Sequence, residues 1–513
     1  MRQAAQALES VAPGPDGRVP DTSEMPAELP PLQHLLERAP HAAVVGDPRV
    51  PVAGVTYRSS EVRLGWLFFA VPGGTVDGHA FAPDAARAGA AAVVCQRPLD
   101  LPEAVVQVVV PSVREAMGPI AAAFYGRPAE TMTVIGVTGT NGKTTTTYLL
   151  ERVFREAGLA PGVIGTTGLR VDGRPEPFER TTPEAPDLHR LLAEMRDRGI
   201  GAVAMEVSSH GLDQHRVGGM RFDCAVFTNL SQDHLDYHGT IEAYLEAKAR
   251  LFTPAMAERA AVNFDSPEGR SLLREDLPTL TYGLGERADV RGTDVALTSD
   301  GVTFRVDGLE VRSRLRGEFN VWNSLAALAA ARQVGIEDGA AVRGIAALPG
   351  VPGRMEPVEA GQPFQVLVDY AHTPDSLENV LRAARPLAGS HRVIAVFGCG
   401  GDRDRGKRPL MGKAATGLAD LTVITSDNPR SEDPEAIIAE IVPGAERGGG
   451  PFEVEPDRRE AIRRAVRAAE PGDVVVIAGK GHEAGQEFAD RTIPFDDRVV
   501  AREELEALCE GAR

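Results

Sequence analysis

The stretch GVTGTNGKTT, residues 136–145, decides the fold of its part of the chain. The apolar run TVIGV (133–137), typical of a buried strand, leads into it, and the helical stretch KTTTTYLLERVFREAG (143–158) follows. A glycine-rich turn between a strand and a helix directs backbone N–H groups toward phosphate oxygens. We expect Lys143 to reach the terminal phosphates and the Thr144 hydroxyl to bind Mg²⁺. The sequence therefore predicts a nucleotide-binding α/β domain.

The stretch departs from the strict phosphate-loop pattern GxxxxGK[ST]. Val137 stands where the first glycine belongs, and Gly136 comes one residue early. The strand, the GTNGKTT turn and the helix together still favour nucleotide binding over a chance glycine-rich turn. The chain has no [NT]KxD motif, which would read guanine, so ATP is favoured over GTP.

Length and composition indicate an acidic, globular protein of several domains. At about 100 to 200 residues per domain, 513 residues suggest three. Lys plus Arg total 55 against 73 Asp plus Glu, a net charge of -18, so we expect no binding to nucleic acid or to anionic membranes. No apolar run approaches the roughly 18 to 20 residues of a membrane span. The four cysteines form no CxxC pair, which fits a reducing compartment and argues against a zinc or disulfide framework.

Composition shifts divide the chain into a leader and three α/β blocks. Residues 1–31, rich in Pro, Gly and acids and without an apolar h-region, are expected to be a disordered leader. Residues 32–128 predict a small α/β domain, and residues 129–349 a central domain with a mainly parallel sheet. A β-hairpin is expected at 301–315. A Pro- and Gly-rich linker leads into the third block, residues 350–513.

Polar residues follow predicted strands of the central block. Glu206 ends the strand GAVAMEV (201–207), and Asp233 and His234 come after the strand FDCAVFTN (222–229). Alone, such residues are more often caps or solvated side chains. After successive strands of a phosphate-loop domain, we expect them to complete a metal site.

The third block predicts four strands with polar tails. The strands FQVLVDY, RVIAVFG, LTVITS and DVVVIAG are followed at once by AHTPD, CGGDRD, DNPR and KGHE. In a doubly wound sheet, ligands bind beyond the carboxyl ends of the strands, so all four tails are expected to face one site.

Eight motifs, in this order, resemble those of the Mur ligases, the ATP-dependent amide-forming enzymes of peptidoglycan synthesis: GTNGKTT, EVSSHGLDQHR, NLSQDHLDYHGT, YLEAKARLF, GEFNVWN, VPGRME, VDYAHTPDS and GCGGDRDRGKRP. The resemblance runs from about residue 50 to the C-terminus and is strongest to the diaminopimelate-adding members. It implies a cytoplasmic enzyme, for which we expect a monomer. Its three domains would hold the UDP end, ATP, and the incoming amino acid, the last on a Rossmann-like fold.

The implied reaction joins meso-diaminopimelate to UDP-N-acetylmuramoyl-L-alanyl-D-glutamate. ATP would phosphorylate the D-glutamate carboxylate, and the amine of the amino acid would attack the resulting acyl phosphate. A carboxylate is a poor acyl donor, so it must first be converted into an acyl phosphate. Phosphate oxygens repel an attacking anion, so Mg²⁺ is needed to neutralise their charge.

The resemblance also implies roles for individual residues. ATP would be bound by Gly139, Thr140, Asn141, Gly142, Lys143, Thr144, Thr145, Asn320, Arg354 and Asp369. The catalytic and metal-binding residues would be Lys143, Thr144, Glu206, His234 and Lys248, the last as a carbamate. The nucleotide-sugar peptide would be bound by Ser59, Thr181, Thr182, Ser208, Gln214 and Arg216, and diaminopimelate by Arg403, Asp427, Asn428, Pro429, Arg430, Gly479 and Glu483.

Two motifs depart from the family pattern. The usual Asp-Ser-Arg is replaced by Arg58-Ser59-Ser60, which leaves the contacts to uridine open, and GHEAGQ lacks the aromatic residue that commonly precedes its Gln.

The segment TSDNPRSEDP (425–434) bears on which amino acid the protein would add to its substrate. By composition alone it is a solvated turn. In the family, DNPR marks the diaminopimelate-adding enzymes, and Arg430 suits the task because it can grip the carboxylate that lysine lacks. Asn428 is expected to bond the same end, while Pro429 stiffens the turn.

Other functions remain open from the sequence. A phosphate-loop switch or motor would leave the tails HTPDS, GGDRD, DNPR and GKGHE unexplained. The lysine-adding and D-alanyl-D-alanine-adding ligases and folylpolyglutamate synthase share parts of the central motif set. A bare nucleotide-binding third domain is disfavoured, because no GxGxxG follows its first strand.

Overall fold

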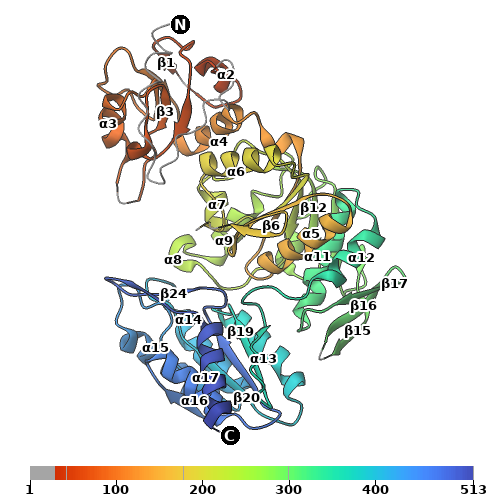
Figure 1. Cartoon of the computed structure of the whole chain (residues 1–513). Helices are drawn as coiled ribbons and strands as arrows, with labels where there is room; N and C mark the ends of the chain where they lie inside the picture. The colour runs from red at the N-terminus through yellow and green to blue at the C-terminus, as the bar shows by residue number, and fades with distance from the viewer. Residues whose placement is uncertain are drawn as a thin grey trace. The chain divides into compact units, whose positions relative to one another are not determined.

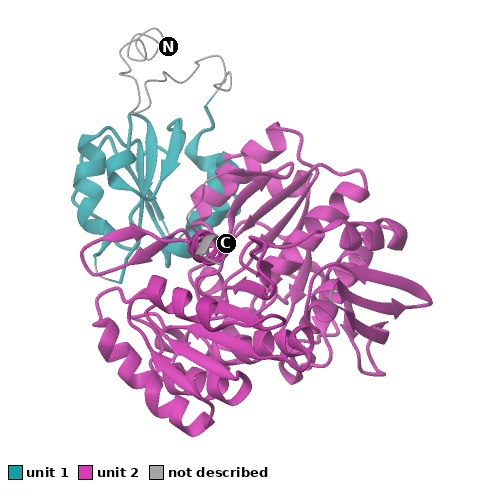
Figure 2. Cartoon of the chain, turned by 60° about the horizontal axis from the view of Figure 1, so that its bottom comes forward, with its two compact units in different colours: residues 1–124 teal, residues 125–513 magenta. Residues whose placement is uncertain are grey.

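The computed structural model describes residues 29–41, 43–74, 76–176, 178, 180–298 and 300–511. The expected leader lies almost entirely outside the described residues. The chain forms two compact units, which divide between Phe124 and Tyr125 (Figure 2).

The first unit is built on a five-stranded sheet of order β1-β5-β4-β3-β2, in which only the edge pair β1–β5 is antiparallel. Its elements are α2 (Leu32–Leu35), β1 (Ala43–Val45), β2 (Gly54–Thr56), η3 (Ser59–Glu61), β3 (Trp66–Phe69), η4 (Gly78–Phe81), α3 (Ala82–Arg87), β4 (Ala92–Cys95), β5 (Val106–Val109) and α4 (Val113–Phe124). Phe68 and Val93 of the sheet share a core with Ala82 and Ala85 of α3. The apolar runs WLFFAV (66–71) and AVVQVVV (104–110) contain β3 and β5.

The second unit begins with a nine-stranded sheet of order β14-β13-β12-β11-β6-β10-β7-β8-β9 (Figure 1). Its strands are β6 (Thr133–Thr138), β7 (Pro161–Gly165), β8 (Gly168–Val171), β9 (Arg174–Glu176), β10 (Ala202–Glu206), β11 (Phe222–Phe227), β12 (Ala257–Asn263), β13 (Thr279–Gly283) and β14 (Val290–Arg291). The pairs from β14 to β7 are parallel, and β8 and β9 add an antiparallel edge. The expected mainly parallel sheet is confirmed.

Helices cover both faces of this sheet. The helices of this region are η5 (Pro128–Thr131), α5 (Lys143–Glu156), α6 (Ala185–Asp197), α7 (Ser209–Asp213), α8 (Leu235–His238), α9 (Ile241–Ala249), α10 (Pro267–Ser271), α11 (Phe319–Gln333) and α12 (Asp338–Ala347). Ile135 packs with α5, α11 and α12, while its neighbour Val134 packs with α6 on the other face. The alternation arises because successive strand residues point to opposite faces. Both faces are apolar, as expected of a parallel sheet.

The order of strands brings the candidate site residues together. β6 lies between β10 and β11, with Glu206 beside Val137 and Phe227 beside Thr138. The polar residues after these strands therefore meet the phosphate loop at one edge of the sheet.

The hairpin expected at 301–315 is present as β16 (Gly301–Val306) and β17 (Leu309–Ser313), which pair antiparallel. A further strand, β15 (Thr293–Thr298), joins them, so the small sheet has three strands.

A six-stranded sheet of order β18-β19-β23-β20-β21-β22 follows, parallel except for β18. The strands are β18 (Glu356–Pro357), β19 (Gln365–Asp369), β20 (Val393–Phe397), β21 (Leu421–Ile424), β22 (Phe452–Val454) and β23 (Val474–Ala478), with a hairpin of β24 (Gly485–Glu487) and β25 (Thr492–Pro494). The helices are α13 (Pro374–Ala388), α14 (Lys407–Leu418), α15 (Pro434–Gly448), α16 (Arg458–Ala468) and α17 (Asp497–Gly511). The four expected strands are neighbours in this one sheet, so their polar tails emerge at the same edge.

The structure also bears on two expectations about the whole chain, which concern membrane spans and cysteines. Among the helices that the structure describes, none combines the length and the apolar character that a membrane span requires. Cys95, Cys224 and Cys399 are buried, and the cysteines are all free thiols in the described part of the chain.

Candidate functional site

The phosphate loop joins β6 to α5 and depends on its glycines. Gly139 has φ 147°, and a Cβ there would lie 1.9 Å from Thr228 Oγ1. Gly142 has φ 88°, in the left-handed region that side chains rarely adopt. Lys143 Nζ donates to carbonyl oxygens of the loop itself, at 2.8 and 3.0 Å. The loop thus has the backbone geometry of a phosphate cradle.

The structure explains why Gly136 and Val137 depart from the strict phosphate-loop pattern GxxxxGK[ST]. Gly136 is inside β6, where a Cβ would lie 2.8 Å from the ring of Phe222, so this glycine serves packing. Val137 is a buried strand residue, and the turn begins only at Gly139.

Glu206 and Thr144 meet beside this loop. Glu206 is 1% exposed, and its carboxylate accepts hydrogen bonds from Thr144 Oγ1 at 2.9 Å and from the N–H and hydroxyl of Thr166 at 2.9 and 3.0 Å. Within the described residues, no lysine, arginine or histidine forms an ion pair with it. A buried carboxylate beside a hydroxyl is a hard oxygen donor set, which suits Mg²⁺.

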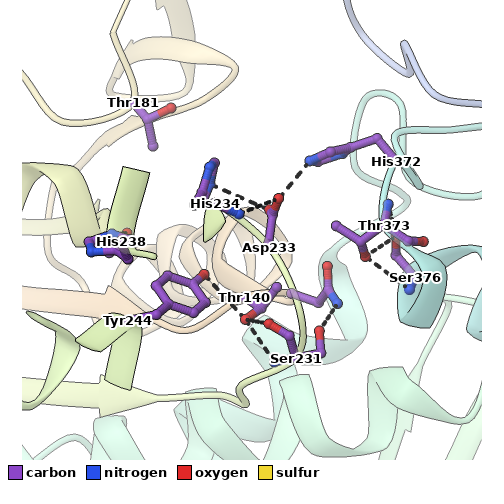
Figure 3. A network of polar contacts seen from close by, with 12 residues as sticks. Thr140, Thr181, Ser231, Asp233, His234, His238, Tyr244, His372, Thr373 and Ser376 are labelled. Atoms are coloured by element: carbon purple, nitrogen blue, oxygen red, sulfur yellow. Dashed lines mark hydrogen bonds and ion pairs between the residues drawn. The ribbon is translucent and has the colours of Figure 1, made fainter. Parts of the chain in front are cut away.

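Asp233 lies at the centre of a charged cluster after β11 (Figure 3). Its carboxylate is 3.4 Å from His234 Nε2, 3.7 Å from His372 Nε2 and 4.0 Å from Lys407 Nζ. Burial opposes its ionisation, but the hydrogen bond from His372 and the nearby positive charges outweigh burial and hold the pKa of Asp233 below its usual range. Desolvation lowers the pKa of His234 to about 3, so the imidazole is neutral and can act as a metal ligand.

Lys248 is a buried amine on α9. It is 1% exposed, donates to the Gly139 carbonyl oxygen at 2.9 Å, and its Nζ lies 4.4 Å from the centroid of the Tyr244 ring. Burial, followed by the charge of Lys143, holds the pKa of Lys248 well below its usual value. A buried amine of lowered pKa is a nucleophile rather than a structural cation.

The expected metal ligands are only partly brought together. Thr144 and Glu206 are in contact, whereas neither His234 nor Lys248 bonds to Glu206. The described residues contain no group of three or more His, Cys, Asp or Glu side chains arranged to hold a metal ion.

A cavity of about 1010 Å³ opens over the loop. Fourteen of the expected residues line it: Thr140, Asn141, Gly142, Lys143, Thr144, Thr145, Thr181, Glu206, Ser208, Asp233, His234, Asn320, Arg354 and Asp369. Phe319, Trp322 and Tyr370, which the sequence did not single out, line it too. Ligand cavities of small-molecule sites span about 300 to 1,000 Å³, so this one is large enough for a nucleotide.

The three expected nucleotide contacts outside the loop are held in place by the protein. Asn320 Nδ2 donates to Arg316 O at 2.6 Å. Arg354 stacks over the Tyr370 ring at 4.7 Å and donates to Thr144 Oγ1 at 3.1 Å. The Asp369 carboxylate accepts two backbone N–H bonds, and burial raises its pKa. Arg354 therefore joins the third block to the phosphate loop.

A chain of hydrogen bonds connects five of the residues expected to bind the nucleotide-sugar peptide to Glu206: Thr181, Thr182, Ser208, Gln214 and Arg216. Thr182 Oγ1 donates to the Glu206 carbonyl oxygen at 2.9 Å, and Arg216 donates to the Thr182 carbonyl oxygen at 3.1 Å. Ser59 lies in η3 of the first unit, half-buried.

The DNPR segment is not a solvated turn. Asp427, Asn428 and Pro429 are buried after β21, and Arg430 adopts φ 52° with its side chain 25% exposed. Arg430 Nε donates to Glu487 Oε2 at 2.8 Å, and its Nη1 donates to the Gly401 carbonyl oxygen at 2.9 Å. Glu487 and the Gly401 carbonyl oxygen thus orient the guanidinium.

The other expected amino-acid contacts surround this segment. Asn428 Nδ2 donates to Glu483 Oε2 at 2.8 Å. Gly479, with φ 119°, comes so close to Asp427 that a Cβ would lie 2.3 Å from its carboxylate. Arg403 is exposed and donates to the Asp402 carbonyl oxygen at 2.9 Å.

A buried ion pair supports this edge of the sheet. Arg458 and Asp497 are both fully buried and are joined at 2.6 Å. Arg458 also donates to the carbonyl oxygens of Ser426, after β21, and Ala478, at the end of β23. The pair thereby holds two of the polar tails at a fixed spacing.

Sequence reasoning missed His372, Lys407, Lys480 and Glu487 as members of the site. His372 and Lys480 fall in the tails AHTPD and KGHE, so the signal was present but gave no reason to choose those side chains. Lys407 and Glu487 join the site through contacts distant in the chain.

Comparison with known proteins assigns the chain's three regions. Residues 51–125 match the Mur ligase family catalytic domain, residues 137–331 the Mur ligase middle domain, and residues 353–481 the Mur ligase glutamate ligase domain.

Curated relatives share almost half of their residues with this chain. UDP-N-acetylmuramoyl-L-alanyl-D-glutamate--2,6-diaminopimelate ligase of Geobacillus thermodenitrificans (strain NG80-2) is 47% identical over 483 residues, which cover 92% of this chain and 98% of that protein. The ligase of the same name from Streptomyces avermitilis is 47% identical over 471 residues, 89% of this chain and 92% of that protein.

Solved structures agree in fold. A structure of a ligase with that name is 37% identical, has a TM-score of 0.66 and covers 93% of this chain and 99% of its own. A MurF ligase of Thermotoga maritima in complex with ADP has a TM-score of 0.62 at 21% identity, covering 90% of this chain and 98% of its own, a likeness of fold alone. With these matched regions, and with 47% identity over nine-tenths of its length, the chain belongs to the Mur ligase family.

Proposed function

We propose that the chain is an ATP-dependent amide ligase that joins meso-diaminopimelate to UDP-N-acetylmuramoyl-L-alanyl-D-glutamate, a cytoplasmic step of peptidoglycan synthesis. The observation that carries this proposal is the oriented Arg430 at the edge where the strand tails of the third sheet emerge. The 2,6-diaminopimelate named for the relatives has a second carboxylate, which suits a guanidinium.

The phosphate loop and its surroundings would bind ATP. On binding, Lys143 would exchange its bonds to loop carbonyl oxygens for bonds to phosphate oxygens. Arg354, which reaches Thr144 from the third block, would hold the transferring phosphate next to the acyl acceptor. Mg²⁺, held by Thr144, Glu206 and His234, would neutralise phosphate oxygens when bound.

Two bond-forming steps follow from this arrangement. A D-glutamate carboxylate oxygen attacks the terminal phosphorus, and ADP leaves. The neutral amine of diaminopimelate then attacks the acyl carbon, phosphate leaves with the bridging oxygen, and the amine loses a proton. Thr181, Thr182, Ser208, Gln214 and Arg216, which are hydrogen-bonded beside Glu206, would hold the peptide end of the acceptor.

We propose further that Lys248 carries a carbamate. Its burial and lowered pKa support this, since CO₂ reacts with an uncharged amine and no carboxylate forms an ion pair with this lysine in the described part of the chain. The carbamate would add an anion near the Gly139 carbonyl oxygen.

We propose that three domains share the task, with boundaries near residues 32–128, 129–349 and 350–513. The first would bind the UDP end, with Ser59 among its contacts, and the protein would act as a monomer. Asp427, Asn428, Gly479, Glu483 and Arg403 would complete the amino-acid site with Arg430.

Phosphate release from ATP tests the proposal. The assay contains UDP-N-acetylmuramoyl-L-Ala-D-Glu and, in separate reactions, meso-diaminopimelate, L-lysine or D-Ala-D-Ala. Turnover with diaminopimelate alone is expected. Equal turnover with lysine would remove the amino-acid assignment, and no turnover with any of the three would remove the ligase assignment.

A further inference from the structure

A fully buried lysine lies beneath the candidate amino-acid site. Lys480 directly follows Gly479 beyond β23 and is 0% exposed. Its Nζ donates to Asn428 Oδ1 at 2.7 Å and to Glu483 Oε2 at 2.9 Å. These partners come from two different strand tails, so one ammonium ties together two expected contacts of the amino acid.

Lys480 determines which way the Asn428 amide faces. Asn428 Oδ1 accepts from Lys480 and from the backbone N–H of Glu487 at 3.1 Å. Both acceptor sites of the amide oxygen are then filled, and Nδ2 is turned to Glu483, at 2.8 Å. Because an ammonium has only donors, the reversed amide would place N–H groups against it.

Lys480 also orients the Glu483 carboxylate. Oε2 receives the bonds from both Lys480 and Asn428, while Oε1 has no hydrogen bond within the described residues. The side chain is 31% exposed. Glu483 Oε1 and the second Nδ2 hydrogen of Asn428 therefore have no hydrogen-bond partner in the described part of the chain.

Such a pair is complementary to an ammonium and a carboxylate on the same carbon. The ammonium would pair with Glu483 and the carboxylate with the Asn428 N–H. A lone ammonium, as at the end of lysine, would satisfy only the first of these groups.

We propose that Lys480 is a positioning residue for the amino-acid site. It sets the orientation of Asn428 and Glu483 without contacting the substrate, and through them favours an amino acid whose far end is a zwitterion. This inference rests on the proposed ligase function.

Steady-state kinetics of K480M test it, with saturating ATP and nucleotide-sugar peptide and with either diaminopimelate or L-lysine. The KM for diaminopimelate is expected to rise on the order of 10- to 100-fold, with a smaller change in kcat, because buried hydrogen-bonding partners lose their donor. The KM for ATP is expected to stay within about twofold, since Lys480 makes no bond to the phosphate loop. The preference for diaminopimelate over lysine is expected to fall about 10-fold or more.

K413M is the matched control, because Lys413 is an exposed lysine of α14 in the same block. It should behave as the wild type in every measurement. ADP-induced stabilisation in thermal melts checks that K480M is folded. If K480M does not fold, K480Q takes its place, because its amide offers an acceptor as well as donors and so no longer fixes the direction of the Asn428 amide. An unchanged amino-acid preference in K480Q overturns the inference.

A double-mutant cycle separates positioning from general structure. If Lys480 acts through Glu483, K480M/E483Q should be no worse than the more severe single variant. Independent, multiplying losses would overturn the inference. A wild type that fails with diaminopimelate refutes the proposed function itself, whereas an active wild type with an unchanged preference in K480M refutes only the role of Lys480.

Discussion

Replacing Arg430 with alanine removes the guanidinium that the DNPR segment orients. Its Nε donates a hydrogen bond to Glu487, and one Nη1 hydrogen is donated to the Gly401 carbonyl oxygen. A guanidinium has five N–H donors, so three remain without a partner in the described part of the chain. One Nη1 hydrogen and one Nη2 hydrogen form the fork that grips a carboxylate with two bonds.

The expected loss follows from these two bonds. Hydrogen bonds to charged groups contribute about 1.5 to 3 kcal/mol each, so two give about 3 to 6 kcal/mol. Glu487 already compensates part of the charge, and the side chain is 25% exposed, so we reduce this to about 2 to 4 kcal/mol. The kcat/KM for diaminopimelate should fall on the order of 30- to 1000-fold.

The assay compares R430A and R430K with the wild type, using diaminopimelate and lysine. R430K keeps the charge but loses the fork, so it should recover only a small part of the loss. ADP binding by calorimetry should be unchanged in both variants. R491A, which removes an exposed arginine of the loop between β24 and β25, is the control. A kcat/KM for R430A within about threefold of the wild type would contradict the bidentate contact and return this segment to a structural turn.

Three further changes probe other parts of the site. G139A should abolish ADP binding in calorimetry, because a Cβ would lie 1.9 Å from Thr228 Oγ1; normal binding would show that the loop adopts another conformation. Removing CO₂ from the buffer should lower turnover, and bicarbonate should restore it, since the lowered pKa of Lys248 leaves an amine ready for carbamylation; turnover indifferent to CO₂ would count against the carbamate. D497N should reduce the free energy of unfolding in urea by about 3 to 5 kcal/mol, because it leaves the buried Arg458 without its counter-charge; a loss under about 1 kcal/mol would mean that water or another group replaces Asp497.

Strands and phosphate loop could be predicted because local chemistry sets them. TVIGV and the four apolar runs of the third block are typical of buried parallel strands, and the turn at Gly139 and Gly142 has positive φ angles, which favour glycine. Strand order was not predictable, and it is strand order that puts Glu206 beside the loop.

The polar connections of the site depend on distant parts of the chain. Glu487 meets Arg430 across 57 residues, and Lys407 approaches Asp233 from the start of another helix. A lone acid such as Glu487 is usually solvated. The motif GCGGDRDRGKRP contains Lys407 but does not show which of its side chains approaches Asp233. The role of Lys480 could not be predicted from the sequence either, because only its burial distinguishes it from a surface lysine.

The contact between Arg430 and Glu487 has a consequence for ionic strength. A substrate carboxylate on the Nη1 and Nη2 fork binds next to Glu487, so repulsion from the Glu487 carboxylate offsets part of its attraction to the guanidinium. Screening by salt weakens the attraction and the repulsion in parallel. The affinity for the amino acid should therefore fall less steeply with added salt than binding to an unpaired arginine would, and E487Q should restore the steeper dependence.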